Sequence, residues 1–186
     1  MTDKQRKHIS KFLSKHLRHD PAGIGLVLED GGWVPVTALL DGCQRAGVKI
    51  TRDELDEIVT TSDKQRYSFD ETGERIRANQ GHSVDVDLQL MPAIPPEVLF
   101  HGTAVQIVDA ILRDGLRKMQ RHHVHLSKDI DTATRVGARH GRPVVFRVDA
   151  AAMAQKGIEF FVSANGVWLT DHVPPEFLQI EEGPTK

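Results

Sequence analysis

The sequence has a single cysteine, Cys43, and this scarcity removes two kinds of site. An internal disulfide needs two cysteines and a CxxC zinc site needs a close pair, so neither is open to this chain. Cys43 falls in the apolar stripe of a predicted helix, and we expect it to be a small buried hydrophobic residue rather than a nucleophile. The absence of disulfides suits a reducing compartment, so we expect a cytoplasmic protein.

Long apolar runs and the common phosphate-binding loops are also missing. No run approaches the ~20 apolar residues of a membrane span, and the first residues are polar and basic, so we expect no membrane segment. Neither GxGxxG nor GxxxxGKS/T occurs, which excludes both standard nucleotide loops. Because the formal net charge is -2, any surface for nucleic acid has to be local.

The first half of the chain carries helical patterns followed by a hairpin. Apolar residues from Ile9 to Leu17 recur at helical spacing, and Asp20–Pro21 ends this helix. The sequence further predicts a strand at 26–28, a helix from Pro35, a helix with a capping box at Thr51–Glu54, and a hairpin of 66–69 with 75–77. Helices followed by a hairpin are typical of a winged helix, a module often used on nucleic acid.

A basic ridge lines a second face of the first helix and ends in Arg18–His19. The lysines of this ridge are equally well explained by a solvated helix face. Arg18 and His19 lie at the helix C-terminus against a glycine-rich turn, and we expect a site there.

The second half is rich in strands with short helices between them. A loop-like stretch and Pro92, Pro95 and Pro96 mark a boundary before it, so we expect domains at 1–83 and 98–186 joined by a linker at 84–97. The pattern predicts an α+β fold rather than a regular βαβ array. It includes a helix after Thr103, the expected N-cap, another from about Asp129, capped by Ser127 or Asp129, and a two-residue hairpin turn at Asn165–Gly166.

One stretch of this half, Arg121–Ser127, concentrates polar groups. Read as a strand, it places Arg121, His123, His125 and Ser127 on one face, with Val124 and Leu126 on the other. Such a row could bind phosphate or ribose, form a metal site, or be an ordinary wet face.

Five stretches resemble the signature blocks of the NAD-dependent RNA 2'-phosphotransferases: Ser14–Pro21, Arg77–Ser83, Leu99–Thr103, Val124–Ser127 and Asn165–Pro175. They occur in order over nearly the whole chain. The resemblance implies a winged-helix-like RNA lobe followed by an ADP-ribosyltransferase-like mixed β lobe that binds NAD. It implies removal of an internal RNA 2'-phosphate by transfer to NAD, through a 2'-phospho-ADP-ribosylated RNA intermediate and a transesterification. The products would be 2'-hydroxyl RNA, nicotinamide and ADP-ribose 1'',2''-cyclic phosphate.

The resemblance also implies site residues and partners. The family's catalytic Arg-His-Arg-Arg set corresponds to Arg18, His19, Arg66 and Arg121. The expected NAD contacts are His101, Gly102, Thr103, His125, Ser127 and Val167, and the expected RNA contacts are Lys11, Lys15 and Arg18. The partner would be a tRNA-like RNA of the kind made in tRNA splicing. We expect no metal and no obligate protein partner.

Three rival hypotheses remain. A metal site at His122, His123 and His125 lacks a clustered cysteine or carboxylate to complete it. A non-catalytic winged-helix protein would leave His101, His125 and the block at 165–175 without a purpose. An ADP-ribosyltransferase that modifies nucleic-acid phosphate ends or protein would share the NAD lobe.

Overall fold

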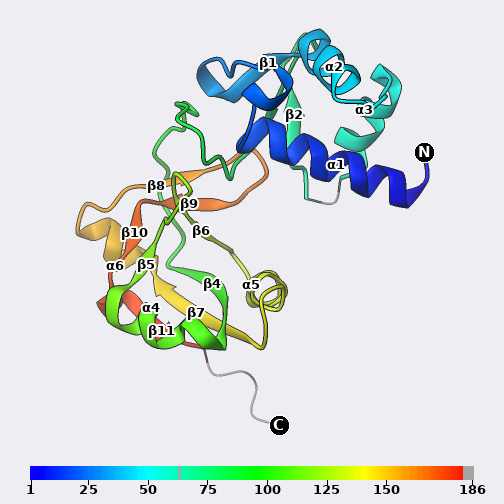
Figure 1. Ribbon diagram of the computed structural model, residues 1–186. Helices are drawn as coiled ribbons and strands as arrows, with labels where there is room; N and C mark the ends of the chain where they lie inside the picture. The colour runs from blue at the N-terminus through cyan, green and yellow to red at the C-terminus, as the bar shows by residue number, and fades with distance from the viewer. Residues whose placement is uncertain (63, 182–186) are drawn as a thin grey trace. The chain divides into compact units, whose positions relative to one another are not determined.

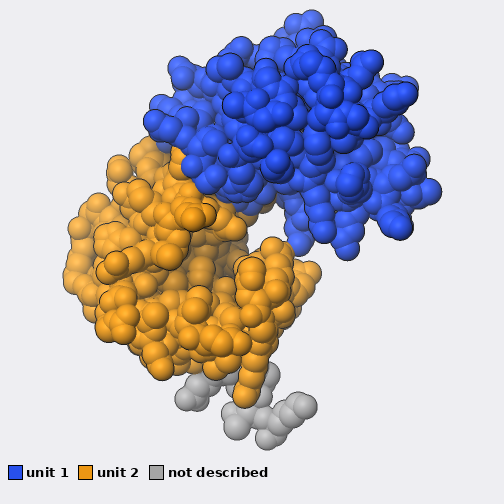
Figure 2. Space-filling view, viewed as in Figure 1, with its two compact units in different colours: residues 1–90 blue, residues 91–186 orange. Residues whose placement is uncertain are grey.

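The computed structural model describes residues 1–62 and 64–181, and the chain divides into two compact units, 1–90 and 91–186 (Figures 1 and 2). The division falls inside the segment expected to be a linker. Asp87 accepts a backbone hydrogen bond from Gly31 at 2.7 Å, so the first part of that segment packs on unit 1. Ala93 donates to the carbonyl of Phe160 at 2.7 Å and thereby adds the second part to unit 2. No helix within the described ranges is both long and apolar enough to cross a membrane.

Unit 1 packs three helices against a small antiparallel sheet. The helices are α1 (Asp3–Arg18), α2 (Val36–Arg45) and α3 (Arg52–Thr60), and the strands are β1 (Trp33–Pro35), β2 (Tyr67–Phe69) and β3 (Arg75–Ala78). The sheet order is β1-β3-β2, so the predicted hairpin β2–β3 is confirmed and gains a third strand that the sequence did not reveal. One apolar core holds these elements together.

The first helix owes its position to its apolar stripe and to one tyrosine. Ile9, Leu13 and Leu17 are buried, as their spacing predicts. The hydroxyl of Tyr67, on β2, donates to the carbonyl of Ser10 and lies 2.6 Å from the hydroxyl of Ser14. Because Tyr67 is buried, these bonds satisfy its polar end while its ring fills the core. The hairpin is therefore fixed against α1.

The predicted strand at 26–28 is wrong. Residues 26–28 form neither strand nor helix. The chain before them makes a 3₁₀ turn at residues 22–24, and Gly25 adopts a left-handed conformation with φ +74°. Leu26 then donates its N–H back to Pro21 at 3.0 Å rather than to a neighbouring strand. The alternation of buried Leu26 with exposed Val27 is real, but it belongs to a loop without a ladder partner.

Unit 2 is a mixed α+β structure. Its strands are β4 (Val98–Ala104), β5 (Leu116–Arg117), β6 (Val124–Leu126), β7 (Pro143–Asp149), β8 (Phe160–Val162), β9 (Trp168–Thr170), β10 (His172–Val173) and β11 (Leu178–Ile180). They form sheets ordered β11-β7-β4, β6-β9-β8 and β10-β5. The helices are α4 (Val108–Asp114), α5 (Ile130–Gly137) and α6 (Ala150–Gln155). The expected α+β class is confirmed for the chain.

Two local predictions in unit 2 need correction. Thr103 is no N-cap, because β4 continues through it and pairs it with Val144, and α4 begins only at Val108. The Asn165–Gly166 hairpin exists, but Ser163 bonds Val167, so the loop has three residues and only Gly166 has positive φ. Neither β5 nor β10 was predicted from the sequence, because a strand of two residues is too short to show an alternation of apolar and polar side chains.

The structure predicts that the Cys43 thiol is unreactive in the folded chain. Cys43 is fully buried in the core of unit 1, and burial raises the pKa of its thiol from 9.0 to about 11. The thiolate is the reactive form, so almost none is present at pH 8. We expect iodoacetamide to label the native protein far more slowly than the urea-unfolded protein, as followed by mass spectrometry. Equal labelling rates would contradict the buried assignment.

Candidate functional site

In unit 1, Arg18 and His19 stand together at the end of α1. Arg18 is the last helical residue and His19 is the C-cap, because the following Asp20–Pro21 stops the helix. The N–H of Ser83 donates to the carbonyl of Arg18 at 2.9 Å, and the Ser83 hydroxyl lies 2.9 Å from Nδ1 of His19. The predicted position of Arg18 and His19 at the end of this helix is confirmed, whereas Ser83 was not predicted to lie beside them.

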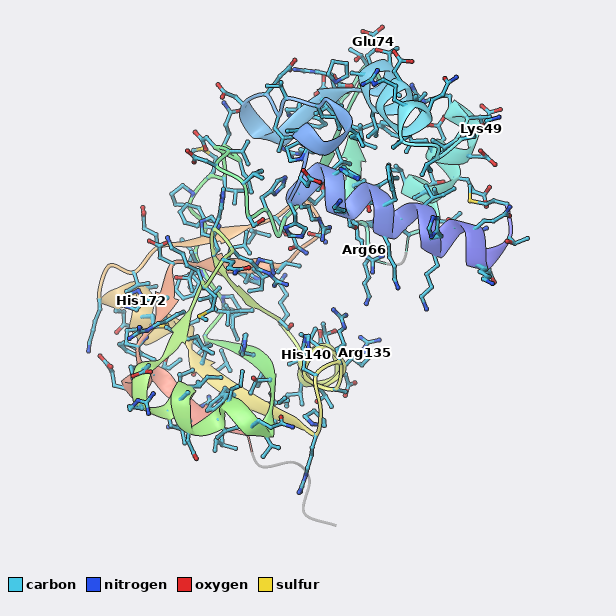
Figure 3. All side chains as sticks on the ribbon, viewed as in Figure 1. Lys49, Arg66, Glu74, Arg135, His140 and His172 are labelled. Atoms are coloured by element: carbon cyan, nitrogen blue, oxygen red, sulfur yellow. The ribbon has the colours of Figure 1, made fainter. Side chains whose placement is uncertain are left out.

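Arg66, labelled in Figure 3, immediately precedes β2. Its backbone is bonded by Asn79, which lies four residues before Ser83. The N–H of Asn79 donates to the carbonyl of Arg66 at 2.9 Å, and its side-chain amide donates to the carbonyl of Gln65. Gln65 has φ +38°, a backbone conformation that costs energy for a residue with a side chain. Residues 79–83 therefore hydrogen-bond to both places from which Arg18, His19 and Arg66 project.

The predicted RNA-binding lysines lie on the surface of α1. Lys11 is exposed, and Lys15 forms an ion pair with Asp20 at 3.1 Å. An exposed ion pair is worth at most about 1 kcal/mol, so an arriving phosphate can take the place of Asp20. The geometry is compatible with the predicted role of both lysines.

In unit 2, two backbone hydrogen bonds bring the predicted cofactor residues together. Phe100 of β4 and Ser127, just after β6, exchange N–H to carbonyl bonds of 2.8 Å each. This bridge joins the sheet containing β4 to the sheet containing β6. As a result, Nδ1 of His101 donates to the carbonyl of His125 at 3.0 Å.

The hydrogen bond of His101 also defines the form of its ring. A carbonyl oxygen only accepts, so Nδ1 carries a proton and Nε2 is the ring nitrogen that accepts when the ring is neutral. Burial lowers the pKa of His101 below its usual 6.5, and the charge of Arg121 lowers it further, while the His125 carbonyl acts in the opposite direction. Near neutral pH His101 is therefore an uncharged acceptor at Nε2.

Arg121 lies on the surface beside His125, with Nη1 3.4 Å from Nδ1 of that ring. The expected strand from Arg121 to Ser127 is only partly correct, because β6 begins at Val124 and residues before it form a turn closed by an Arg121 to Lys118 bond. Val124 and Leu126 are buried, as the alternation predicts. Arg121 reaches His125 from this turn rather than along a strand.

The remaining predicted cofactor residues divide into packing and surface roles. Gly102 touches α5 so closely that a Cβ there would lie 1.6 Å from the carbonyl oxygen of Ala133. Thr103 is buried inside β4. Asp129, and not Ser127, caps α5 by accepting from the N–H of Thr132 at 2.7 Å, so the Ser127 hydroxyl is not needed for capping. Val167 is half-buried, and the β6–β9 register continued by one residue would set it opposite Ser127.

The neighbouring histidines do not assemble a metal site. The ring of His123 lies 5.5 Å from that of Phe161, and burial lowers the pKa of His123. Within the described residues, no three side chains of histidine, cysteine, aspartate or glutamate are grouped as metal ligands. The metal hypothesis for His122, His123 and His125 has no support in this geometry.

Each unit therefore presents its own set of groups suited to a phosphorylated, hydroxylated ligand. Unit 1 offers the guanidinium groups of Arg18 and Arg66 with the imidazole of His19. Guanidinium forks match phosphate oxygens in pairs. Unit 2 offers an acceptor nitrogen on His101, the hydroxyl of Ser127 and the cation of Arg121.

The sequence of the whole chain matches known proteins. The model of the RNA 2'-phosphotransferase, Tpt1 / KptA family matches residues 4–172. A probable RNA 2'-phosphotransferase of Trichormus variabilis is 59% identical over 180 residues, which are 97% of this chain and 99% of that protein. One of Nostoc punctiforme is 60% identical over 96% of this chain and 99% of its own length, and one of Streptomyces griseus is 55% identical over 96% and 98%.

The chain itself is built from a helical unit with a hairpin and a strand-rich unit. It belongs to the RNA 2'-phosphotransferase family. The resemblance read from the five sequence blocks is confirmed.

Gly102 is predicted to be required for the packing of α5 on β4. In Gly102→Ala the new methyl group would meet the backbone oxygen of Ala133, which cannot rotate away. We expect the free energy of unfolding to fall by about 3 kcal/mol in urea denaturation followed by circular dichroism. The control is Gly157→Ala, where φ is +82° and no atom lies within 4 Å, so only about 1 kcal/mol of backbone strain is expected. Equal losses in the two variants would contradict the close contact.

His101 is predicted to make the stability of the chain depend on pH. The pKa of His101 is lowered in the folded state, so between that value and 6.5 the unfolded chain binds the extra proton. Its contribution to stability is therefore present above pH 6.5 and is lost as the pH falls below it.

The measurement compares the wild type with His101→Asn, whose side-chain amide replaces Nδ1–H as donor to His125. Urea denaturation at pH 7.5 and pH 5.5 should show a larger loss of stability in the wild type than in the variant. If both lose the same amount, His101 is not the titrating group.

Proposed function

We propose that this protein removes an internal 2'-phosphate from RNA by transferring it to NAD, giving 2'-hydroxyl RNA, nicotinamide and ADP-ribose 1'',2''-cyclic phosphate. The observation that carries the proposal is that residues 79–83 hydrogen-bond to the backbone of Arg18 and Arg66 and to the ring of His19, in a chain that belongs to the RNA 2'-phosphotransferase family. A winged-helix-like role for unit 1 and an ADP-ribosyltransferase-like role for unit 2 are part of the same proposal.

The groups of unit 2 fit a nicotinamide dinucleotide. The Nε2 atom of His101 can accept from a ribose hydroxyl, because its Nδ1–H is already committed to His125. The Ser127 hydroxyl adds a partner that both donates and accepts, and half-buried Val167 adds an apolar contact. When bound, NAD would supply a ribose carbon with a cationic leaving group and a ribose hydroxyl.

The proposed chemistry asks mainly for positioning and for compensation of negative charge. A 2'-phosphate is an anionic nucleophile already, so it needs no general base to begin the transfer. Arg18, Arg66 and Arg121 are proposed to bind phosphate oxygens and to neutralise the charge that spreads over them. His19 is proposed to orient the phosphate or a hydroxyl and to move a proton at its ring nitrogen.

Lys11 and Lys15 are proposed to contact the RNA backbone. Both lie on the exposed face of α1, the helix that ends in Arg18. Their contribution would be sequence-independent and would weaken with salt, because it arises from neutralised phosphates.

The test is to incubate the purified protein with NAD and an RNA that carries one internal 2'-phosphate. Formation of 2'-hydroxyl RNA together with ADP-ribose 1'',2''-cyclic phosphate supports the proposal. A stable ADP-ribosylated RNA end or protein would instead identify a transferase of that kind. Intact NAD and intact RNA in a protein that binds the RNA would identify a binding module.

Arg121 is predicted to be needed for turnover and not for folding. Its side chain is exposed beside His125, so Arg121→Ala should leave the unfolding transition unchanged. We expect kcat to fall by about 10³-fold, since an arginine that stabilises a transferred phosphoryl group is worth factors of this size. Arg121→Lys should recover little, because an ammonium group cannot bind two oxygens in a fixed fork.

The matched control for this prediction is Arg113→Ala. Arg113 is exposed on α4 of the same unit and pairs with Asp114 at 3.0 Å. Loss of this surface pair should change kcat by no more than about twofold. Near-wild-type turnover in Arg121→Ala would show that Arg121 has no part in the reaction.

A further inference from the structure

Residues 79–83 form a short segment whose contacts reach the two places in unit 1 that carry Arg18, His19 and Arg66. We name this segment, Asn79–Ser83, the bracing segment. At one end Asn79 bonds to the backbone of Gln65 and Arg66, and at the other end Ser83 bonds to the backbone of Arg18. Arg18 and Arg66 lie in elements separated by α2 and α3 in the chain, so their relative placement depends on tertiary contacts such as these.

Ser83 makes one contact that backbone bracing alone does not require. Its hydroxyl lies 2.9 Å from Nδ1 of His19, while its own N–H is used on the carbonyl of Arg18. A hydroxyl can donate or accept, so the contact holds for either placement of the ring proton. It fixes the rotation of the imidazole in both cases.

A hydrogen bond of this kind matters for His19 because His19 is a helix C-cap. Its φ of -125° and ψ of -33° are outside the regular helix, and its side chain is exposed at the end of α1. An exposed side chain at a helix end samples several rotamers unless a partner holds it. The Ser83 hydroxyl is such a partner, supplied from 64 residues away along the chain.

We propose that Ser83 is a positioning residue of the reaction: it holds Nδ1 of His19 so that the opposite ring nitrogen, Nε2, is directed to the substrate. Ser83 itself does not touch the reacting atoms. The inference rests on the proposed function in one respect: the proposed function supplies the substrate that His19 would contact. The orientation of the His19 ring is a property of the chain alone and is measurable without turnover.

Two buried side chains, Asn79 and His82, anchor the bracing segment on unit 1. Asn79 is buried, and its side-chain amide holds the strained backbone of Gln65 next to Arg66. His82, next to Ser83, is also buried, close to where a Cβ on Gly32 would lie. Ser83 is therefore an exposed hydroxyl on an anchored backbone, which suits a group that has to hold a neighbour in place.

The test compares Ser83→Ala, Ser83→Thr and the control Ser10→Ala. The substitution Ser83→Thr keeps the hydroxyl, and the exposed position has room for the added methyl group. Ser10 lies earlier on α1, and its side chain makes no hydrogen bond among the described residues. All three variants should unfold at the same temperature as the wild type within about 2 °C, since surface substitutions cost little.

The first measurement uses NMR scalar couplings and NOEs to determine the side-chain rotamers of His19. In Ser83→Ala the ring should populate several rotamers, while Ser83→Thr and Ser10→Ala should keep the rotamer of the wild type. An unchanged rotamer distribution in Ser83→Ala would overturn the proposal, whether or not the protein turns over the 2'-phosphorylated RNA.

The second measurement is steady-state kinetics on RNA with an internal 2'-phosphate. We expect Ser83→Ala to lower kcat by about tenfold with little change in the KM for RNA, to shift the pH profile of kcat, and to be rescued by Ser83→Thr. A wild type without activity would overturn the proposed function and leave the NMR result to decide the role of Ser83. An active wild type with an equally active Ser83→Ala would overturn the positioning role alone.

Discussion

The arrangement of the candidate site depends on hydrogen bonds that hold imidazole and guanidinium groups at fixed places on backbone. In unit 2, the exchange of two N–H to carbonyl bonds between Phe100 and Ser127 joins two sheets and sets His101 against the carbonyl of His125. That single carbonyl decides which nitrogen of His101 carries the proton. The shared apolar core also packs the two sheets together, but the bridge sets the register in which His101 meets His125.

In unit 1, a short segment of the chain, rather than a bridge between two sheets, makes the hydrogen bonds that position the candidate side chains. The proposed phosphate-binding groups of this unit project from a helix end and from the start of a strand, and neither position is rigid by itself. The bracing segment Asn79–Ser83 binds the backbone at both positions and the ring of His19. Both units thus keep apolar packing in the core and use a few long-range polar contacts to position the candidate groups.

The sequence predicted the fold wherever a helix or strand was long enough to show a regular spacing of apolar residues. The helix at 3–18, the capping box at Thr51 and the hairpin of 67–78 are where their patterns place them. The failures occurred in short elements and at one place where strand pairing overrode a local preference. Leu26–Leu28 lacks a partner strand, β5 and β10 have two residues each, and β4 runs through Thr103 because its pairing with β7 outweighs a capping preference.

The sequence by itself determined the family, the α+β class and the identity of the candidate residues, because motif blocks and periodicity are properties of the chain order. Only the tertiary structure decided what each residue does locally. It assigned Gly102 to the contact with α5, left Ser127 outside the cap of that helix, and placed the Ser83 hydroxyl on His19. Those facts depend on distances between residues far apart in the chain, which no local pattern records.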